Sequence, residues 1–207
     1  MTEAIKLEYL PQYTWRDYLE FEGKWELIHG VPYNRAPAPV KKHQYVSNNI
    51  AWQLRELLKE CEHCMALLPI DYRIDEETMV QPDNLIVCDE PLEGRFLDKA
   101  PRVIFEILSP ATIIKDTRLK YELYESAGVE NYVIVDPERK HVTHYRLGSE
   151  GYEKTAEGER VELRFELPGC VVTFDASKIW DRKSGKLKTK GERQRTRALS
   201  HPLTFSF

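Results

Sequence analysis

A single charged residue inside an apolar run constrains this sequence more than any other feature. Arg102-Val-Ile-Phe-Glu-Ile-Leu108 is a continuous run of strand-forming residues that contains one carboxylate, Glu106. Such runs are typical of strands covered on both faces, so we expect Glu106 to be buried or nearly buried. An ionised carboxylate there costs several kcal/mol unless it is paired, protonated or bound to a metal. The run therefore predicts a central strand that carries a functional acid.

Hydrophobic periodicity predicts helices and short strands around this run. The strongest helix covers about residues 41–61, where apolar residues recur at helical spacing, and a second covers 116–126 and ends before Gly128. A short helix is expected over 14–22, and a hairpin over 25–33 that turns at Gly30. The expected strands are 65–68, 70–74, 85–88, 103–108 and 132–135, followed by a meander over 141–147, 151–155 and 161–165. Together these elements predict an α/β class, a mixed β-sheet flanked by helices.

Length and charge predict one domain with a basic tail. The chain has 207 residues and a net charge of −4, and we take residues 1–181 as the domain and 182–207 as the tail. The tail holds eight Lys or Arg and one acid, Glu192, so the domain is acidic. A tail so poor in apolar residues is expected to be disordered, although its charge can attract phosphates. An acidic domain argues against non-specific clamping of nucleic acid along its whole surface.

The sequence favours a cytoplasmic protein. Its longest apolar runs span only a few residues, whereas a membrane helix needs about 20. The N-terminal stretch also lacks the uninterrupted apolar segment of a secretory signal.

Four cysteines are too few to predict a disulfide framework in a chain of this length. Cys61-Glu-His-Cys64 has the spacing of zinc ligands, but a structural zinc site usually needs a second pair. Cys88 and Cys170 are single and distant in sequence. We therefore expect Cys61 to act as a small core residue.

A second carboxylate, Asp83, precedes the apolar run 85–88. Pro82 has no N–H group to donate, so it marks the entrance or edge of a strand. If the strands over 85–88 and 103–108 are neighbours, Asp83 and Glu106 converge on one point. Two close carboxylates repel each other unless a cation holds them, and Mg²⁺ or Mn²⁺ with water as further ligands fits that arrangement. Such an ion can activate water and stabilise charge on a phosphodiester oxygen.

The spacing of these acids resembles a known nuclease motif. Pro82-Asp83, followed after 22 residues by Glu106-Ile-Leu, resembles the Pro-Asp…(Asp/Glu)-X-Lys core of restriction-endonuclease-like nucleases. The closer resemblance is to a large bacterial family of uncharacterised endonucleases of that superfamily, over about residues 10–180. The matching stretches are WELIHG (25–30), QPDNLIVCD (81–89), PRVIFEILSPAT (101–112) and DTRLKYELYESAGVENYVIVDP (116–137).

The resemblance implies a restriction-endonuclease-like fold and a Mg²⁺-dependent endodeoxyribonuclease, with Mn²⁺ as a substitute metal. It makes Asp83 and Glu106 metal ligands and the carbonyl of Ile107 a third ligand. It also matches Glu26, in WELIHG, with an acidic position near the metal. An ordinary exposed acid on a strand is an equally good interpretation of Glu26.

The sequence departs from the motif where a lysine is expected two residues after Glu106, because that residue is Leu108. The lysine orients the attacking water and stabilises negative charge. Lys120, four residues after Asp116 on the following helix, is the best replacement, and the family resemblance also places a lysine there. Lys115 and Arg118 are weaker candidates. A solvated ion pair with Asp116 is the alternative interpretation of Lys120.

Two further alternatives remain for the acids, since Glu106 could form a buried salt bridge without metal and Asp83 could be a turn acid after proline. His43, near the start of the long helix, could face the same point, although a lone histidine is more often a polar helix residue.

The leading hypothesis is an endonuclease acting on DNA, and a homodimer would suit a two-stranded substrate. The competing hypothesis is a catalytically inactive nucleic-acid-binding or protein-interaction module that retains the fold, which Leu108 and the acidic domain favour. A nuclease for RNA or for branched structures is a third possibility.

Overall fold

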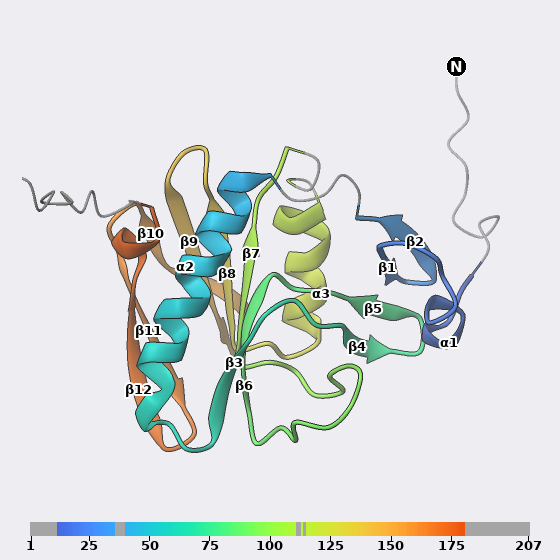
Figure 1. The fold of residues 1–207 in the computed structure, drawn as a ribbon, viewed down its shortest axis with the longest axis horizontal. Helices are drawn as coiled ribbons and strands as arrows, with labels where there is room; N and C mark the ends of the chain where they lie inside the picture. Colours follow the sequence, from blue (N-terminus) through green and yellow to red (C-terminus); the bar gives the residue numbers. More distant parts are fainter. Residues whose placement is uncertain (1–11, 36–39, 111–112, 114, 181–207) are drawn as a thin grey trace, which may run out of the picture.

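The structure is a computed structural model that describes residues 12–35, 40–110, 113 and 115–180 (Figure 1). Its helices are α1 (Trp15–Tyr18), α2 (Lys41–Leu57) and α3 (Lys120–Ser126), with 3₁₀ turns at Leu58–Glu60 and Ala176–Ile179 and a π-helical turn at Lys115–Leu119. Its strands are β1 (Trp25–Ile28), β2 (Val31–Asn34), β3 (Cys64–Leu67), β4 (Tyr72–Asp75), β5 (Thr78–Val80), β6 (Asn84–Cys88), β7 (Val103–Ile107), β8 (Asn131–Asp136), β9 (His141–Gly148), β10 (Gly151–Gly158), β11 (Glu162–Leu167) and β12 (Cys170–Asp175). The basic tail predicted over 182–207 lies outside the described residues. None of the described helices is long and apolar enough to cross a membrane.

A six-stranded mixed sheet forms the centre of the molecule. Its strand order is β10-β9-β8-β7-β6-β3, and β7 and β8 run parallel while the other neighbours are antiparallel. All five residues of β7 are buried, as the apolar run predicts. Because side chains alternate along a strand, Phe105 and Ile107 face one side of the sheet, whereas Ile104 and Glu106 face the other.

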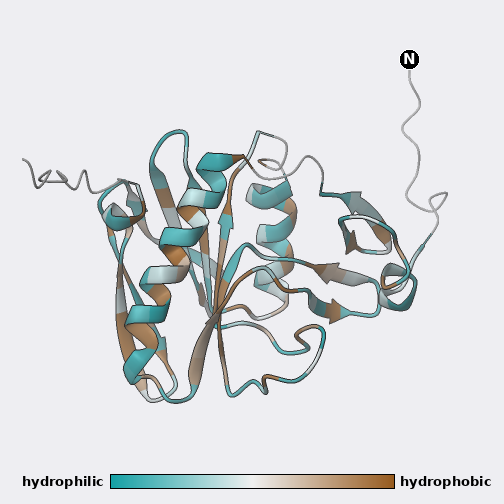
Figure 2. Cartoon of the chain, viewed as in Figure 1, coloured by the Kyte–Doolittle hydropathy of each residue, from teal (hydrophilic) through white to brown (hydrophobic). Residues whose placement is uncertain are grey.

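The two faces of this sheet are covered by different elements. Helix α2 and the hairpin β11–β12 cover the face that carries Phe105 and Ile107. Helix α3 covers the opposite face, where Leu123 and Tyr124 pack on Ile104. Hydrophobic residues follow the central strands in Figure 2, where they line the interior between these layers. Glu106 therefore projects into an apolar layer beneath α3.

A smaller four-stranded sheet, β2-β1-β5-β4, lies beside the main sheet (Figure 1). Its β1–β2 hairpin turns at His29 and Gly30, which both have positive φ, at 50° and 73°. Two positive φ values define the type I′ turn whose twist matches paired strands, and glycine adopts that conformation without strain. This hairpin carries Glu26 to Lys120 of α3, above the central strand β7.

The sequence-based elements agree with the structure in position, but the helix expected over 14–22 covers only Trp15–Tyr18, and two strands were not predicted. Residues 78–80 form β5 and residues 170–175 form β12, neither of which periodicity predicts. Strand β5 has three residues, all buried, and so shows no alternation. Strand β12 pairs with β11 as a separate hairpin, so the predicted meander ends at β10.

The expectation for the cysteines was wrong. Cys61 is bonded to Cys170 and Cys64 to Cys88. The pairing of the cysteines depends on tertiary structure, because β3 lies next to β6 in the main sheet and β12 packs against α2. Residues 24 and 109 positions apart in sequence are thereby brought into contact.

His144 predicts how stability depends on pH. Its side chain is buried between Asn131 and Thr155, and burial followed by repulsion from Arg146 lowers its pKa from 6.5 to about 4. Between these two values the unfolded chain binds more protons, so the stabilisation by neutral His144 is complete above pH 6.5 and is lost as pH falls through 4. At about 1.4 kcal/mol per pKa unit, the loss between pH 6.5 and pH 4.5 is about 3 kcal/mol. Urea unfolding near neutral pH and near pH 4.5 measures it.

The matched control is His141, a partly exposed histidine on the same strand. The His144→Gln variant should lose less stability on acidification than the wild type, whereas His141→Gln should lose as much as the wild type. Equal acid sensitivity of all three proteins would contradict the assignment.

Candidate active site

Glu106 lies at the centre of a buried cluster of charges. This residue is 3% exposed, and its Oε1 accepts hydrogen bonds from Lys120 Nζ at 2.7 Å and from the Tyr124 hydroxyl at 2.8 Å. Lys120 and Tyr124 are four residues apart on α3, so they lie on one face of that helix. Strand β7 thus supplies the carboxylate, and α3 supplies two donors above it.

Lys120 joins Glu106 to a second buried acid. Its Nζ lies 2.7 Å from Oε1 of Glu26, on β1, and 3.9 Å from Oδ1 of Asp116. Lys120 is 2% exposed and Glu26 fully buried, so both alternative interpretations, a solvated pair for Lys120 and an exposed acid for Glu26, are wrong. Glu26 Oε1 also accepts the backbone N–H of Gln81 at 3.0 Å. Three carboxylates therefore surround one ammonium group.

The π-helical turn brings a second lysine to the same place. Lys115, at the start of this turn, forms an ion pair with Oε2 of Glu26. In an α-helix two residues five apart point in directions about 140° apart, but a π turn closes between residues five apart and brings them to one side. Lys115 and Lys120 can thus both reach Glu26. Lys115 is the more accessible of the two, with 15% of its side chain exposed.

Asp83 lies at the entrance of β6, beside the end of β7. Its Oδ2 accepts the backbone N–H of Ile107 at 2.8 Å and lies 3.2 Å from Nε2 of His43, in the first turn of α2. Three elements therefore meet at this carboxylate, which makes it more than a turn acid. Among the described residues, the buried side-chain atoms without a hydrogen-bond partner are Nδ1 of His43 and the two amide atoms of Asn84, all in direct neighbours of Asp83. Such atoms are rare in folded proteins, and a catalytic role is one of the explanations for them.

Burial and charge move the pKa values of the cluster in opposite directions. Burial, together with the charges of Asp116, Asp83 and Glu26, raises the pKa of Glu106 to about 8 against the opposing effect of Lys120. Burial also opposes ionisation of Glu26, but Lys120 and Lys115 outweigh it and lower the pKa of Glu26 to about 2. Burial would lower the pKa of Lys120, yet the surrounding carboxylates raise it well above its ordinary value. The lysine is thus a permanent cation.

The oxygen donors around Asp83 and Glu106 suit a hard divalent ion. The charge of Asp83 raises the pKa of Glu106, which indicates that the two carboxylates are close. In a β-strand the N–H and C=O groups of one residue point to the same side of the strand. Because the N–H of Ile107 donates to Asp83, the carbonyl of Ile107 also points toward Asp83. Two carboxylates, one carbonyl and water form a ligand set that Mg²⁺ accepts. Within the described ranges no group of three or more His, Cys, Asp or Glu side chains is arranged as a metal site. The set therefore depends on the carbonyl and water.

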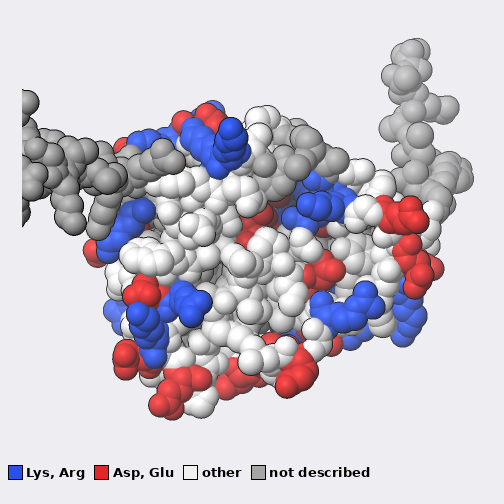
Figure 3. Space-filling model, in the orientation of Figure 1, with Lys and Arg blue, Asp and Glu red and all other residues white. Residues whose placement is uncertain are grey.

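The four predicted side chains Glu26, Asp83, Glu106 and Lys120 belong to one connected site. Sequence reasoning left the role of His43 open and preferred Lys120 to Lys115. It did not assign a function to Tyr124, although the spacing of Asp116, Lys120 and Tyr124 at four-residue intervals was a usable signal. The face of the molecule seen in Figure 3 carries acidic and basic side chains side by side.

Comparisons with known proteins bear on the family and the fold of the chain. The model of a family described as "Uma2: Putative restriction endonuclease" matches residues 15–175. A solved structure of "a putative nuclease belonging to DUF820" from Anabaena variabilis superposes with a TM-score of 0.67 at 17% sequence identity, over 81% of this chain and 97% of that one. At this identity the likeness concerns the fold, and it confirms the predicted mixed sheet flanked by helices. A search of curated proteins found no match.

Proposed function

The chain belongs to the Uma2 family of putative restriction endonucleases, and from that premise we propose that it is a Mg²⁺-dependent endonuclease that hydrolyses phosphodiester bonds in DNA. The observation that carries the proposal is the buried pair Asp83 and Glu106, with the ammonium of Lys120 2.7 Å from Glu106. A fold seldom retains so many buried charges without a use, because each costs several kcal/mol to remove from water.

In this proposal Asp83, Glu106 and the Ile107 carbonyl hold the metal. When bound, Mg²⁺ supplies a water of lowered pKa and neutralises charge on the phosphodiester. Water adds to phosphorus and gives up a proton, the bond to the leaving sugar oxygen breaks, and that oxygen takes up a proton. His43 orients Asp83 through its Nε2, in the way that groups behind metal ligands commonly do.

Lys120 takes the role of the lysine that position 108 lacks. Its ammonium holds Glu106 and Glu26 in place and adds fixed positive charge beside the reacting phosphate. Lys115, at the more accessible end of the network, is a second cation for phosphate oxygens. Glu26 positions both lysines, so it acts through them and not as a metal ligand.

Plasmid cleavage tests the proposal. The wild type should nick or linearise supercoiled plasmid in Mg²⁺ or Mn²⁺ and should be inactive in a chelator. Asp83→Asn should lose cleavage by more than about 100-fold, the upper range for residues that merely support a metal ligand. Asp98→Asn is the matched control, because Asp98 forms an exposed pair with Arg73 and should retain activity. Cleavage without metal, or an active Asp83→Asn, would contradict the proposal.

Two observations favour a non-catalytic module that retains the fold. Leu108 replaces the motif lysine, and Glu106 is already hydrogen-bonded by two donors without a metal, Lys120 and Tyr124. For such a module Mn²⁺ would not bind, and the wild type would cleave neither DNA nor RNA. If the wild type cleaved RNA but not DNA, the proposed substrate would be wrong and the proposed site would stand.

The homodimer and the cytoplasmic location stay predictions, and sedimentation of the purified chain tests the homodimer.

A further inference from the structure

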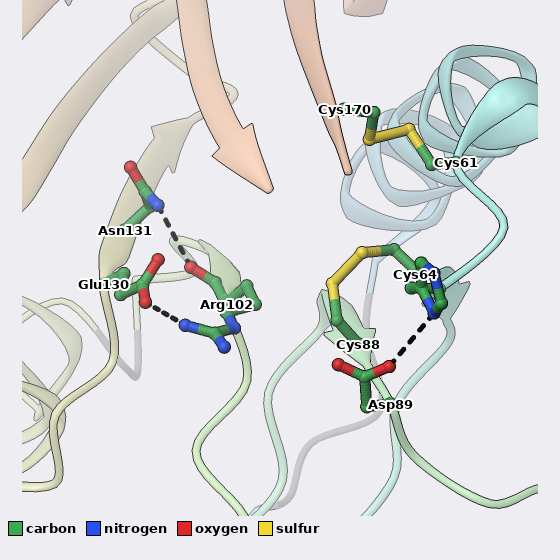
Figure 4. Close-up of a disulfide and its surroundings, with 9 residues drawn as sticks. Cys61, Cys64, Cys88, Asp89, Arg102, Glu130, Asn131 and Cys170 are labelled. Carbon is green, nitrogen blue, oxygen red and sulfur yellow. Dashed lines mark hydrogen bonds and ion pairs between the residues drawn. A yellow bond between two sulfur atoms is a disulfide. The ribbon is translucent and has the colours of Figure 1, made fainter. Parts of the chain in front are cut away.

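The four cysteines lie together at the end of α2 opposite His43. Cys61 and Cys64 flank a tight turn in which the Cys64 N–H donates to the Cys61 carbonyl at 3.1 Å. Their disulfide partners are Cys170, at a Cα–Cα distance of 5.7 Å, and Cys88, at 4.0 Å. Figure 4 shows the two disulfides side by side. All the cysteine side chains contribute to the same hydrophobic cluster, so the four sulfur atoms occupy one side of the main sheet.

The segments that carry these cysteines are ends of elements. Cys64 and Cys88 form the last pair of the edge strand β3 with β6. Cys61 follows the 3₁₀ turn after α2, and Cys170 opens β12 directly after the turn at Gly169. A Cβ on Gly169 would lie 3.6 Å from the ring of His63, which places the β11–β12 turn over the Cys61–Cys64 turn. Ends of elements open more easily than their interiors, so these segments can adjust once the disulfides are reduced.

Four cysteines in this arrangement have the composition of a structural zinc site. Zinc prefers four thiolates in a tetrahedron, with one pair spaced as Cys-x₂-Cys. The fold supplies the second pair, Cys88 and Cys170, that the linear sequence lacks. His63 is not part of the set, because its ring is 61% exposed and contacts Asp89. A cytoplasm also keeps most thiols reduced, so the free thiols are the state to consider there.

We propose that, once both disulfides are reduced, Cys61, Cys64, Cys88 and Cys170 bind one Zn²⁺ ion as a tetrathiolate site that ties α2, β3, β6 and β12 together. A phosphine reductant cleaves each disulfide: the phosphine becomes its oxide, and water supplies the oxygen atom and the two thiol hydrogens. Zinc binding then converts four thiols to thiolates and releases four protons. With both disulfides formed, no group of three or more His, Cys, Asp or Glu within the described residues is arranged to hold a metal ion, so the site requires their reduction.

The test uses the full chain, reduced with a phosphine and dialysed against ZnCl₂. Elemental analysis should find one zinc per chain. When Co²⁺ replaces Zn²⁺, the intensity of the thiolate-to-cobalt charge-transfer bands should correspond to four thiolate ligands, and the visible bands should be those of a tetrahedral ion. Cys88→Ser and Cys170→Ser should each lose the bound zinc. His63→Ala is the matched control and should retain it.

If the variants do not fold, circular dichroism and a thiol assay on the wild type test whether the zinc site exists. A reduced chain that unfolds without metal and refolds with Zn²⁺ supports the site, because binding then drives folding. A reduced chain with four reactive thiols and no zinc would overturn it. So would a reduced chain that Zn²⁺ does not refold, a cobalt spectrum of fewer thiolates, or zinc lost from His63→Ala.

This site is independent of the proposed nuclease activity. It follows the C-terminal end of α2, a helix of 17 residues, whereas His43 lies in the first turn. At 1.5 Å per residue the two ends are about 25 Å apart. Cys88→Ser should therefore remove zinc without altering the Mg²⁺ site, and Asp83→Asn should remove cleavage without altering zinc content.

Discussion

Lys120→Met should lower the free energy of unfolding by about 3–5 kcal/mol and abolish plasmid cleavage. The lysine is 2% exposed and lies 2.7 Å from both Glu26 and Glu106. Methionine fills nearly the same volume but leaves those carboxylates buried without their cation, and removal of one partner from a buried ion pair has a cost of about this size. Chemical denaturation of the metal-free protein measures the change in stability.

Lys115→Met is the matched control for this variant. Among the described residues Lys115 pairs with one carboxylate, Glu26, and it is more accessible to water, so its loss should cost clearly less than the loss of Lys120. Equal costs for the two variants, or a Lys120→Met protein as stable as the wild type, would show that the buried cluster does not depend on Lys120.

Glu106→Gln should lose cleavage by more than about 100-fold while its free energy of unfolding stays at or above the wild-type value. The amide keeps the shape of the side chain but cannot serve as an anionic metal ligand, so binding and activation of Mg²⁺ both fail. Stability is retained because burial raises the pKa of Glu106 to about 8, which means that the fold disfavours its charged form. Lys120 keeps its second partner, Glu26.

Parallel cleavage and denaturation experiments check this separation of function from stability. Glu130→Gln is the control, because Glu130 forms a partly exposed pair with Arg102 away from the cluster and should cleave normally. If Glu106→Gln remained active, Glu106 would be a structural salt-bridge residue. If it unfolded, the carboxylate would be more important for the fold than for the reaction.

Several features of the site could be predicted because they are local in sequence. The apolar run around Glu106 required a covered strand, and β7 is completely buried. Pro82 marked the entrance of β6, which places Asp83 at the end of β7. Lys120 followed from its spacing to Asp116 and from the family resemblance. In each case neighbouring residues carry much of the signal, although the convergence of Asp83 and Glu106 also required the pairing of β6 with β7.

Other features depend on contacts between distant segments, and periodicity does not report these. His43 meets Asp83 across 40 positions, and Glu26 meets Lys115 across 89. The π turn that directs Lys115 toward Glu26 leaves no trace in the hydrophobic pattern. The cysteines are the clearest case, since Cys170 reaches Cys61 only because β12 packs beneath α2.

Calorimetric titration of Mn²⁺ into the wild type and Asp83→Asn, with plasmid cleavage in the same buffer, tests the central claim most directly. The proposed function predicts that the wild type binds Mn²⁺ and cleaves, and that Asp83→Asn, folded by circular dichroism, does neither. If the wild type binds no metal and leaves plasmid intact, or if Asp83→Asn binds as well as the wild type, Asp83 and Glu106 are not a metal site and the nuclease proposal is wrong.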